Sequence, residues 1–228
     1  MAILSNFTNF TINRIIIVST VALALSVKNS LQIPLKDFLT LTFQQKESLE
    51  QFREEVKHKV PHDYMKKDSY LIYWLRDQLF NVSDAKELLT KNLAWREKNK
   101  MDTIMEEDWA DFDYEYRVNI EGCDKEGKPV FSIPIGDWDI RRAVIAGKGD
   151  KLMRYFDKVF EEASTMIRLM QADGQNATQL IVIFDVSSFS LGQHSCPRCL
   201  SIYLYLMSTL QAHYPGYVHK LISVNLYP

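Results

Sequence analysis

The chain has 228 residues, with 27 basic and 29 acidic side chains and a formal net charge of −2. This length suits one domain with an appendage, and the balanced charge gives no sign of a nucleic-acid partner. Three cysteines are too few for a fold held together by disulfide bonds, whereas a hydrophobic content of 46% is enough for a large apolar interior.

Residues 1–35 differ in pattern from the rest of the chain. Ile15–Leu25 is an apolar run that follows Arg14, and Ala22-Leu23-Ala24 is typical of a signal-peptide cleavage site. The run is short for a bilayer span. Two interpretations stay open, a signal peptide over residues 1–24 and a buried or disordered N-terminal extension. N-glycosylation sequons compatible with secretion occur at Asn6, Asn9, Asn81 and Asn176.

Residues 36–105 are predicted to form a small all-α module. Thr42 and Gln45 make a capping box that predicts a helix ending before Pro61. A second helix is predicted from Asp68, and a third with Ser83 as its N-cap. Apolar residues at helical spacing are expected to face inward: Leu49, Phe52 and Val56 in the first helix, Leu71, Trp74, Leu75 and Leu79 in the second, and Ala85, Leu88, Leu89 and Leu93 in the third. Three short amphipathic helices of this kind form a compact helical subdomain.

Residues 106–228 alternate between strand and helix patterns. A turn rich in glycine separates two predicted strands, and a long helix, a buried strand, a buried helix and another strand follow. In chain order these are Tyr116–Ile120, Val130–Ile135, a helix capped by Asp150 that ends near Gly174, Leu180–Val186, Leu200–Leu210 (expected to be buried nearly all round) and Lys220–Leu226. A strand, a crossover helix and a strand form the right-handed parallel unit of an α/β fold.

The long helix carries two neighbouring carboxylates. Glu161 and Glu162 are offset from its apolar stripe, so we expect both on the solvated face and not as a catalytic pair. The methionine and aromatic side chains of the stripe itself are expected to belong to the core in preference to a ligand wall.

Cys196-Pro197-Arg198-Cys199 has chemical content of its own. A pair of cysteines that opens a helix after a strand is found in thiol–disulfide oxidoreductases, and it also supplies zinc ligands in other proteins. The loop before Cys196 is long for the redox fold, and no fourth zinc ligand lies at a suitable spacing. We expect two small residues at a helix start, and a local disulfide is an open alternative in a secreted chain. A thiol–disulfide oxidoreductase or a zinc-binding protein built on this pair stays the alternative function of the chain.

Several short motifs, in order, resemble the CRAL-TRIO lipid-binding family. Similar motifs in that family are a helix ending in Arg76, a Phe-x-Val-x-x-Ala turn at Phe80, and a Trp-Arg helix end at Trp95. The hairpin 122–130, the strand end Phe184-Asp185-Val186-Ser187, the turn His213-Tyr214-Pro215 and the strand end Asn225-Leu226-Tyr227-Pro228 complete the set. The resemblance implies a fold of class α/β, with a mixed sheet covered by helices after the all-α module, over residues 106–228.

The resemblance also implies a function. Proteins of this family bind a phospholipid, retinoid, tocopherol or similar hydrophobic molecule and carry it between membranes, without enzymatic chemistry, cofactor or metal. Transient contact with a membrane surface and a cytoplasmic location are implied as well. Family chains continue beyond the point that corresponds to Pro228 with a gating helix, so we expect a truncated isoform or a partial gene model, and a non-binding truncated isoform is a further alternative.

The predicted pocket wall follows from strand alternation and helical spacing. It comprises Phe131, Ile133, Ile183, Tyr203, Leu206 and Leu210.

Overall fold

The computed structural model describes residues 38–175 and 177–226, which belong to one compact unit. The predicted N-terminal segment 1–35 and the sequons at Asn6, Asn9 and Asn176 lie outside the described residues. Within the described part, no helix is both long and apolar enough to cross a lipid bilayer.

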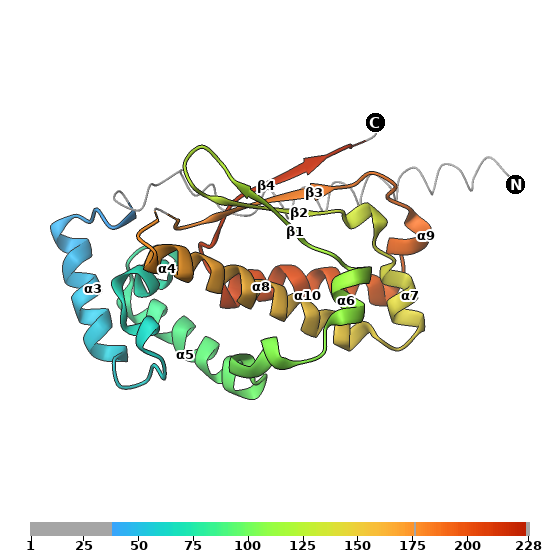
Figure 1. The fold of residues 1–228 in the computed structure, drawn as a ribbon. Coiled ribbons are helices and arrows are strands. Elements are labelled where there is room, and N and C mark those ends of the chain that lie inside the picture. Colours follow the sequence, from blue (N-terminus) through green and yellow to red (C-terminus); the bar gives the residue numbers. More distant parts are fainter. Residues whose placement is uncertain (1–37, 176, 227–228) are drawn as a thin grey trace, which may run out of the picture. The chain divides into compact units, whose positions relative to one another are not determined.

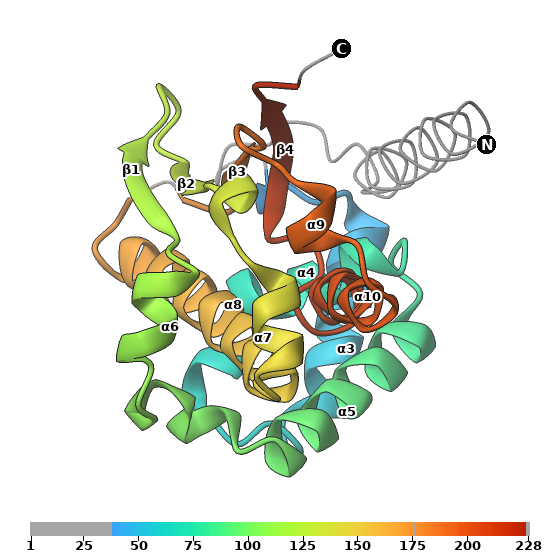
Figure 2. The same cartoon turned by 90° about the vertical axis from the view of Figure 1, so that its right-hand side faces the viewer.

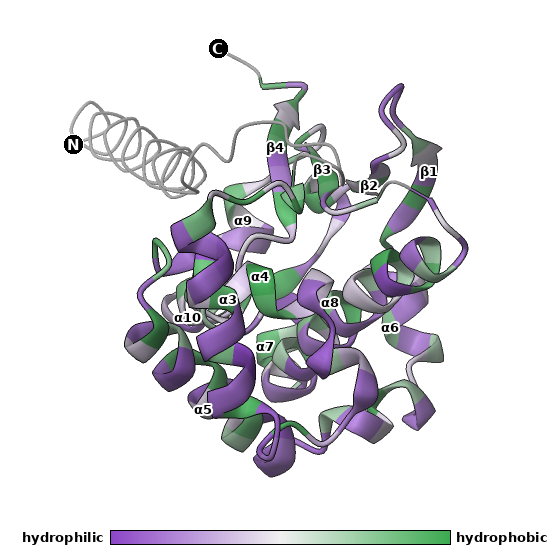
Figure 3. Cartoon of the chain, turned by 90° about the vertical axis from the view of Figure 1, so that its left-hand side faces the viewer, coloured by the Kyte–Doolittle hydropathy of each residue, from purple (hydrophilic) through white to green (hydrophobic). Residues whose placement is uncertain are grey.

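The first part of the described chain is helical, as predicted. Its elements are α3 (Phe43–Val56), the 3-10 turn η1 (Asp63–Lys66), α4 (Asp68–Asp77), α5 (Val82–Lys98), η2 (Met101–Glu106) and α6 (Ala110–Glu115). The Thr42 hydroxyl accepts from the backbone N–H of Gln45, and the Gln45 side chain accepts from that of Thr42, so the predicted capping box is present. Figure 3 shows that α3 is mostly hydrophilic and α4 mostly hydrophobic. The α4 residues Tyr70–Leu75 are all buried.

Two details of this part differ from the prediction. The N-cap of α5 is Asn81, whose side chain accepts from the backbone N–H of Asp84, and not Ser83. Leu79 is 83% exposed because α4 ends at Asp77 and Leu79 adopts a left-handed backbone conformation (φ 51°) in the turn that follows.

The sheet has four strands in the order β1 (Asn119–Cys123), β2 (Pro129–Ile133), β3 (Leu180–Asp185) and β4 (Val218–Val224). β1 and β2 are an antiparallel hairpin, and β2, β3 and β4 run parallel. β1 begins three residues after the predicted start, and β4 begins two residues before it, because its first residue, Val218, already pairs with Leu180.

The remaining helices are η3 (Ile135–Asp137), α7 (Ile140–Ile145), α8 (Gly149–Ala172), α9 (Leu191–His194) and α10 (Pro197–His213). Figures 1 and 2 show α8 and α10 lying side by side against one face of the sheet, and Figure 1 shows α5 on their far side and α3 and α4 toward one end. α8 has its N-cap at Lys148, so Asp150 is in its first turn. α10 is not buried all round, since Leu200 and Leu204 are 60% and 50% exposed.

The helices join the sheet through continuous packing. One cluster of buried side chains lies between α4, α8 and the sheet and includes Ile72, Phe131, Ile167 and Leu180. Tyr73 of α4 stacks on Tyr217 before β4, with ring centroids 4.3 Å apart, and donates its hydroxyl to the Thr178 carbonyl before β3. Helix α4 therefore packs directly on the end of the sheet where β3 and β4 begin.

Candidate functional site

An apolar cavity lies between the sheet and helices α8 and α10. From the sheet, the side chains of Phe131, Val182 and Leu221 line it, and these three residues are paired across β2, β3 and β4. From the helices come Phe156, Val159, Phe160 and Ala163 of α8, and Leu206, Met207 and Leu210 of α10. The parallel strands and their two crossover helices thus build its floor and roof.

Four of the six residues predicted for the wall line this cavity: Phe131, Ile133, Leu206 and Leu210. Ile183 does not, because side chains alternate along β3 and its neighbours Val182 and Phe184 are the ones turned toward the helices.

Tyr203 lies outside the cavity lining as well. Tyr203 precedes the part of α10 that lines the cavity. Its hydroxyl forms a 2.6 Å hydrogen bond with Nδ1 of His194 in α9. Helical spacing alone placed it on the same face as Leu206 and could not show where the cavity ends.

The lining from α8 was interpreted from the sequence as core. Phe156 is buried, whereas Val159 and Phe160 are half-buried, and all three face the cavity. Tyr214 and Tyr217, which follow α10, close its far side. The apolar stripe of α8 was visible in the sequence, but no pattern distinguishes a side chain that packs on the sheet from one that borders a cavity.

The cavity is small and presents only apolar atoms. Its volume is about 60 Å³, well below the roughly 300–1,000 Å³ of pockets that enclose drug-sized ligands. Half-buried residues occur in every part of its lining: Val118, Ile133, Val159, Phe160, Phe184, Leu206, Met207, Leu210 and Leu221. The buried indole N–H of Trp138 has no hydrogen-bond partner among the described residues, but it adds no polar surface to the cavity.

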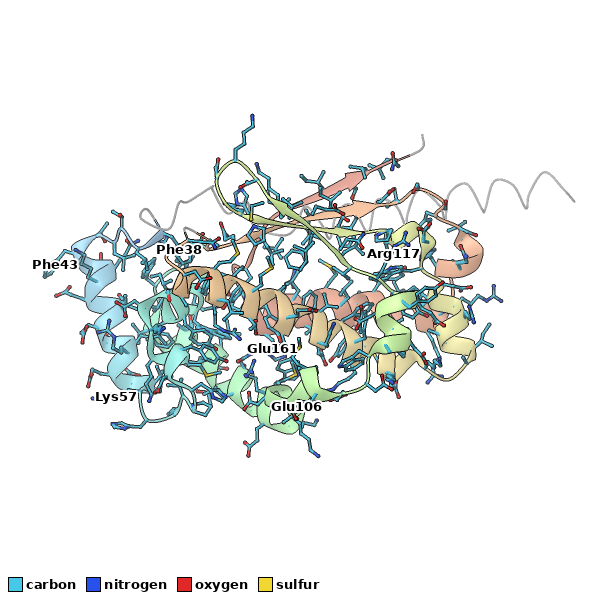
Figure 4. The ribbon with its side chains drawn as sticks, viewed as in Figure 1. Phe38, Phe43, Lys57, Glu106, Arg117 and Glu161 are labelled. Atoms are coloured by element: carbon cyan, nitrogen blue, oxygen red, sulfur yellow. A yellow bond between two sulfur atoms is a disulfide. The ribbon has the colours of Figure 1, made fainter. Side chains whose placement is uncertain are left out.

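A buried charge cluster lies on the other side of α8, centred on Glu161 (Figure 4). Glu161 is only 6% exposed, so its predicted place on the solvated face is wrong. Its carboxylate accepts from Arg96 of α5 at 2.7 Å, from Arg168 at 3.3 Å and from the Tyr214 hydroxyl at 3.0 Å. Glu162 does lie at the surface, where it pairs with Lys158.

The electrostatics of this cluster favour the ionised form of Glu161 beside the two arginines. Burial opposes a charge on Glu161, but the guanidinium groups of Arg96 and Arg168 outweigh it and lower the pKa of the carboxyl group. Arg96 also donates to Asp102 at 2.9 Å. The cluster therefore joins α5, η2, α8 and the turn after α10 by charged hydrogen bonds, directly behind the cavity wall that Tyr214 provides.

A second buried carboxylate lies between α8 and α10. Asp157 is 1% exposed, and both of its oxygens lie 2.9 Å from the Tyr205 hydroxyl. Burial raises the pKa of Asp157 to about 6, since one neutral hydroxyl compensates little of the lost solvation.

The loop after β3 is held by two motif residues that are forty positions apart in sequence. Asp185 accepts from the side-chain amide of Asn225 at 2.7 Å and from the backbone N–H of Ser187 at 2.9 Å. These hydrogen bonds lower the pKa of Asp185. They connect the ends of β3 and β4, and so explain the pairing of an aspartate and an asparagine at those strand ends.

Cys196 and Cys199 are joined in a disulfide at the start of α10. Within the described part of the chain, no group of three or more histidine, cysteine, aspartate or glutamate side chains is arranged to hold a metal ion.

Comparisons with known proteins identify relatives. The model of the CRAL/TRIO domain family matches residues 114–226. Among curated proteins, Patellin-4 of Arabidopsis thaliana is 27% identical over 160 residues, and Protein real-time of Aedes aegypti is 25% identical over 195 residues. These matches cover 70% and 79% of this chain, but only 28% of either relative.

Protein ctg-1 of Caenorhabditis elegans is 22% identical over 161 residues, which are 69% of this chain and 42% of that protein. Among solved structures, that of Sfh5 is similar with a TM-score of 0.65 and 14% identity, covering 82% of this chain and 73% of the other. This last similarity concerns the fold alone.

Proposed function

Because the chain belongs to the CRAL/TRIO family, we propose that it binds a hydrophobic molecule between the sheet and helices α8 and α10, and that it carries this molecule between membranes. The ligand class is a phospholipid, retinoid, tocopherol or similar lipid. The proposed role involves binding and release without covalent chemistry, in keeping with cavity walls that present no polar atom.

The apolar cavity is the observation that carries this proposal. Sheet residues from three strands and helix residues from α8 and α10 turn apolar atoms toward the same space, which favours an apolar occupant over an aqueous one. Its volume of about 60 Å³ is too small for a whole lipid. Loading therefore requires one wall to move.

The wall with the fewest buried side chains is α10. Only Cys199, Ile202 and Thr209 of this helix are buried, whereas ten residues of α8 are. Moving α10 away from the sheet disturbs less packing than moving α8, and the half-buried Leu206 and Met207 lie on its cavity side. We propose that α10 moves outward from the sheet to admit the ligand.

Contact with a membrane is part of the same proposal. Leu200 and Leu204 are exposed on the outer surface of α10, and Ile222 is 40% exposed on β4. These side chains lie on α10 and β4, which both contribute residues to the cavity lining, so an apolar ligand released there would leave the protein next to apolar groups that favour a lipid surface.

A tryptophan placed in the cavity tests the binding site. Leu206→Trp should fill the cavity and reduce the loading of a fluorescent fatty-acyl probe at least tenfold, while overpacking lowers the free energy of unfolding by about 1–3 kcal/mol. Leu204→Trp is the matched control, because it adds the same side chain to the same helix at a position that is 50% exposed. Equal loading of the two folded variants would contradict the assignment.

Native mass spectrometry of the purified chain gives the ligand class directly. Protein expressed in lipid-containing cells should retain one molecule whose mass identifies it, and Leu206→Trp should lose it. A wild-type chain that retains no lipid and also fails to load the fluorescent probe would overturn the proposed function.

A further inference from the structure

The two cysteines at the start of α10 differ sharply in their access to solvent. Cys199 is fully buried and packs in the core with Ile202, whereas Cys196 is half-buried at the end of the helix. Cys196 is therefore the more accessible of the two residues to an attacking group from solution, while part of it packs against the core cluster that contains Cys199. This asymmetry is the one that thiol–disulfide exchange at a single sulfur requires.

The surroundings of Cys196 stabilise negative charge on its sulfur. Cys196 is the N-cap of α10, and its Sγ accepts the backbone N–H of Cys199 at 3.0 Å. The dipole of this 17-residue helix adds positive potential at the same end. Arg198 is exposed within the motif, and no acidic residue follows Asp185 in the sequence.

We propose that Cys196 and Cys199 are a reversible dithiol–disulfide pair that exchanges with a low-molecular-weight thiol of the glutathione class. A thiolate attacks Sγ of Cys196, the bond to Cys199 breaks, and Cys199 leaves as a thiolate that takes up a proton. A second thiol then attacks the mixed disulfide on its non-protein sulfur, which releases the oxidised small disulfide and the Cys196 thiolate. Two thiols are oxidised and one protein disulfide is reduced, so two electrons are transferred in total.

The cysteine pair lies at the start of α10, the helix that we propose to move, so its redox state affects that helix. Cys199 and Ile202 anchor the first turns of α10 in the core, and Leu206 and Leu210 continue the same helix along the cavity. The disulfide closes the first turn covalently, whereas the reduced form holds it by the hydrogen bond to Cys196 and by packing alone. This site lies outside the cavity lining and goes beyond lipid binding.

The test uses the full chain with Cys123→Ser, which removes the exposed free thiol on β1. Two variants separate the cysteines. Cys199→Ala leaves Cys196 alone, and Cys196→Ser leaves Cys199 alone while keeping a side chain that caps helices well. Each folded variant is incubated with oxidised glutathione, quenched with acid and weighed by intact mass spectrometry. The parent chain is treated in native buffer with excess reduced glutathione, and this sample and an untreated one are then quenched with a maleimide in guanidinium chloride and weighed in the same way.

The expected results are specific. Cys199→Ala should gain one glutathione at least ten times faster than Cys196→Ser, and this difference should disappear in guanidinium chloride, where both sulfurs are exposed. The parent chain reduced in its native state should gain two maleimides in the denaturing quench, and the untreated chain should gain none. Equal rates in the folded variants, or a disulfide that native protein retains in excess reduced glutathione, would overturn the proposal. Both readouts are independent of lipid loading, so failure here is distinguishable from failure of the proposed function.

Discussion

Removing the charge of Glu161 should destabilise the whole described unit. Glu161→Gln keeps the shape of the side chain, but it leaves Arg96 and Arg168, whose side chains are 10% and 20% exposed, without their shared anion. Breaking a buried ion pair by removal of one partner costs about 3–5 kcal/mol. Arg96 retains Asp102, and the new amide still accepts one hydrogen bond, so we expect the lower end, about 3 kcal/mol.

Urea unfolding followed by tryptophan fluorescence measures this loss. Glu162→Gln is the matched control, since it removes the neighbouring charge, whose side chain is 44% exposed and paired with Lys158. The Lys158 side chain is only 10% exposed but keeps Asp113 as a partner at 2.9 Å, so we expect a loss within the range of about 0–1 kcal/mol that is typical of exposed pairs. The folded state lowers the pKa of Glu161, so its contribution is present above the unfolded value of 4.5 and is lost as the pH falls through the folded pKa. Equal losses for the two variants at pH 7 would refute the reasoning.

Two further substitutions should stabilise the protein. Burial raises the folded pKa of Asp157 to about 6, above its ordinary value of 3.8, so stability falls as the pH rises from about 4 to 6. Asp157→Asn keeps an acceptor for Tyr205 and should raise the free energy of unfolding by up to about 3 kcal/mol at pH 8 and by nothing near pH 3; no gain at pH 8 would contradict the burial argument. Leu79→Gly should add about 1 kcal/mol in the same urea assay, because glycine adopts the left-handed conformation of this exposed position without strain, and a loss would show that the side chain packs.

The sequence predicted where helices and strands lie better than it predicted which of their side chains face the interior. The capping box at Thr42 located the start of α3, and the run Leu180–Val186 located both ends of β3 within one residue. Since that strand is apolar at nearly every position, nothing in it tells which side chains face the helices, and Ile183 was assigned to the cavity in place of Val182. α10 was expected to be buried all round for the same reason.

The charge cluster could not be predicted from local pattern. Glu161 lies next to Glu162 in a helix with an otherwise regular apolar stripe, and its partner Arg96 is 65 positions away. Only the packing of α5 against α8 brings the two groups together. The cavity is similar in this respect, since Tyr214 and Tyr217 enter its wall from a turn whose position depends on the whole fold.

The absence of polar surface in the cavity has a consequence for selectivity. Without a directed donor or acceptor, the walls can rank apolar ligands only by the area that each one buries and by the length at which it meets the closed end formed by Tyr214 and Tyr217. Each buried methylene contributes about 0.8 kcal/mol, which corresponds to roughly a fourfold change in affinity. For the proposed lipid ligands, we therefore expect the affinity to rise by a constant factor with each added carbon and to fall once the hydrocarbon chain is longer than the space that a movement of α10 would open.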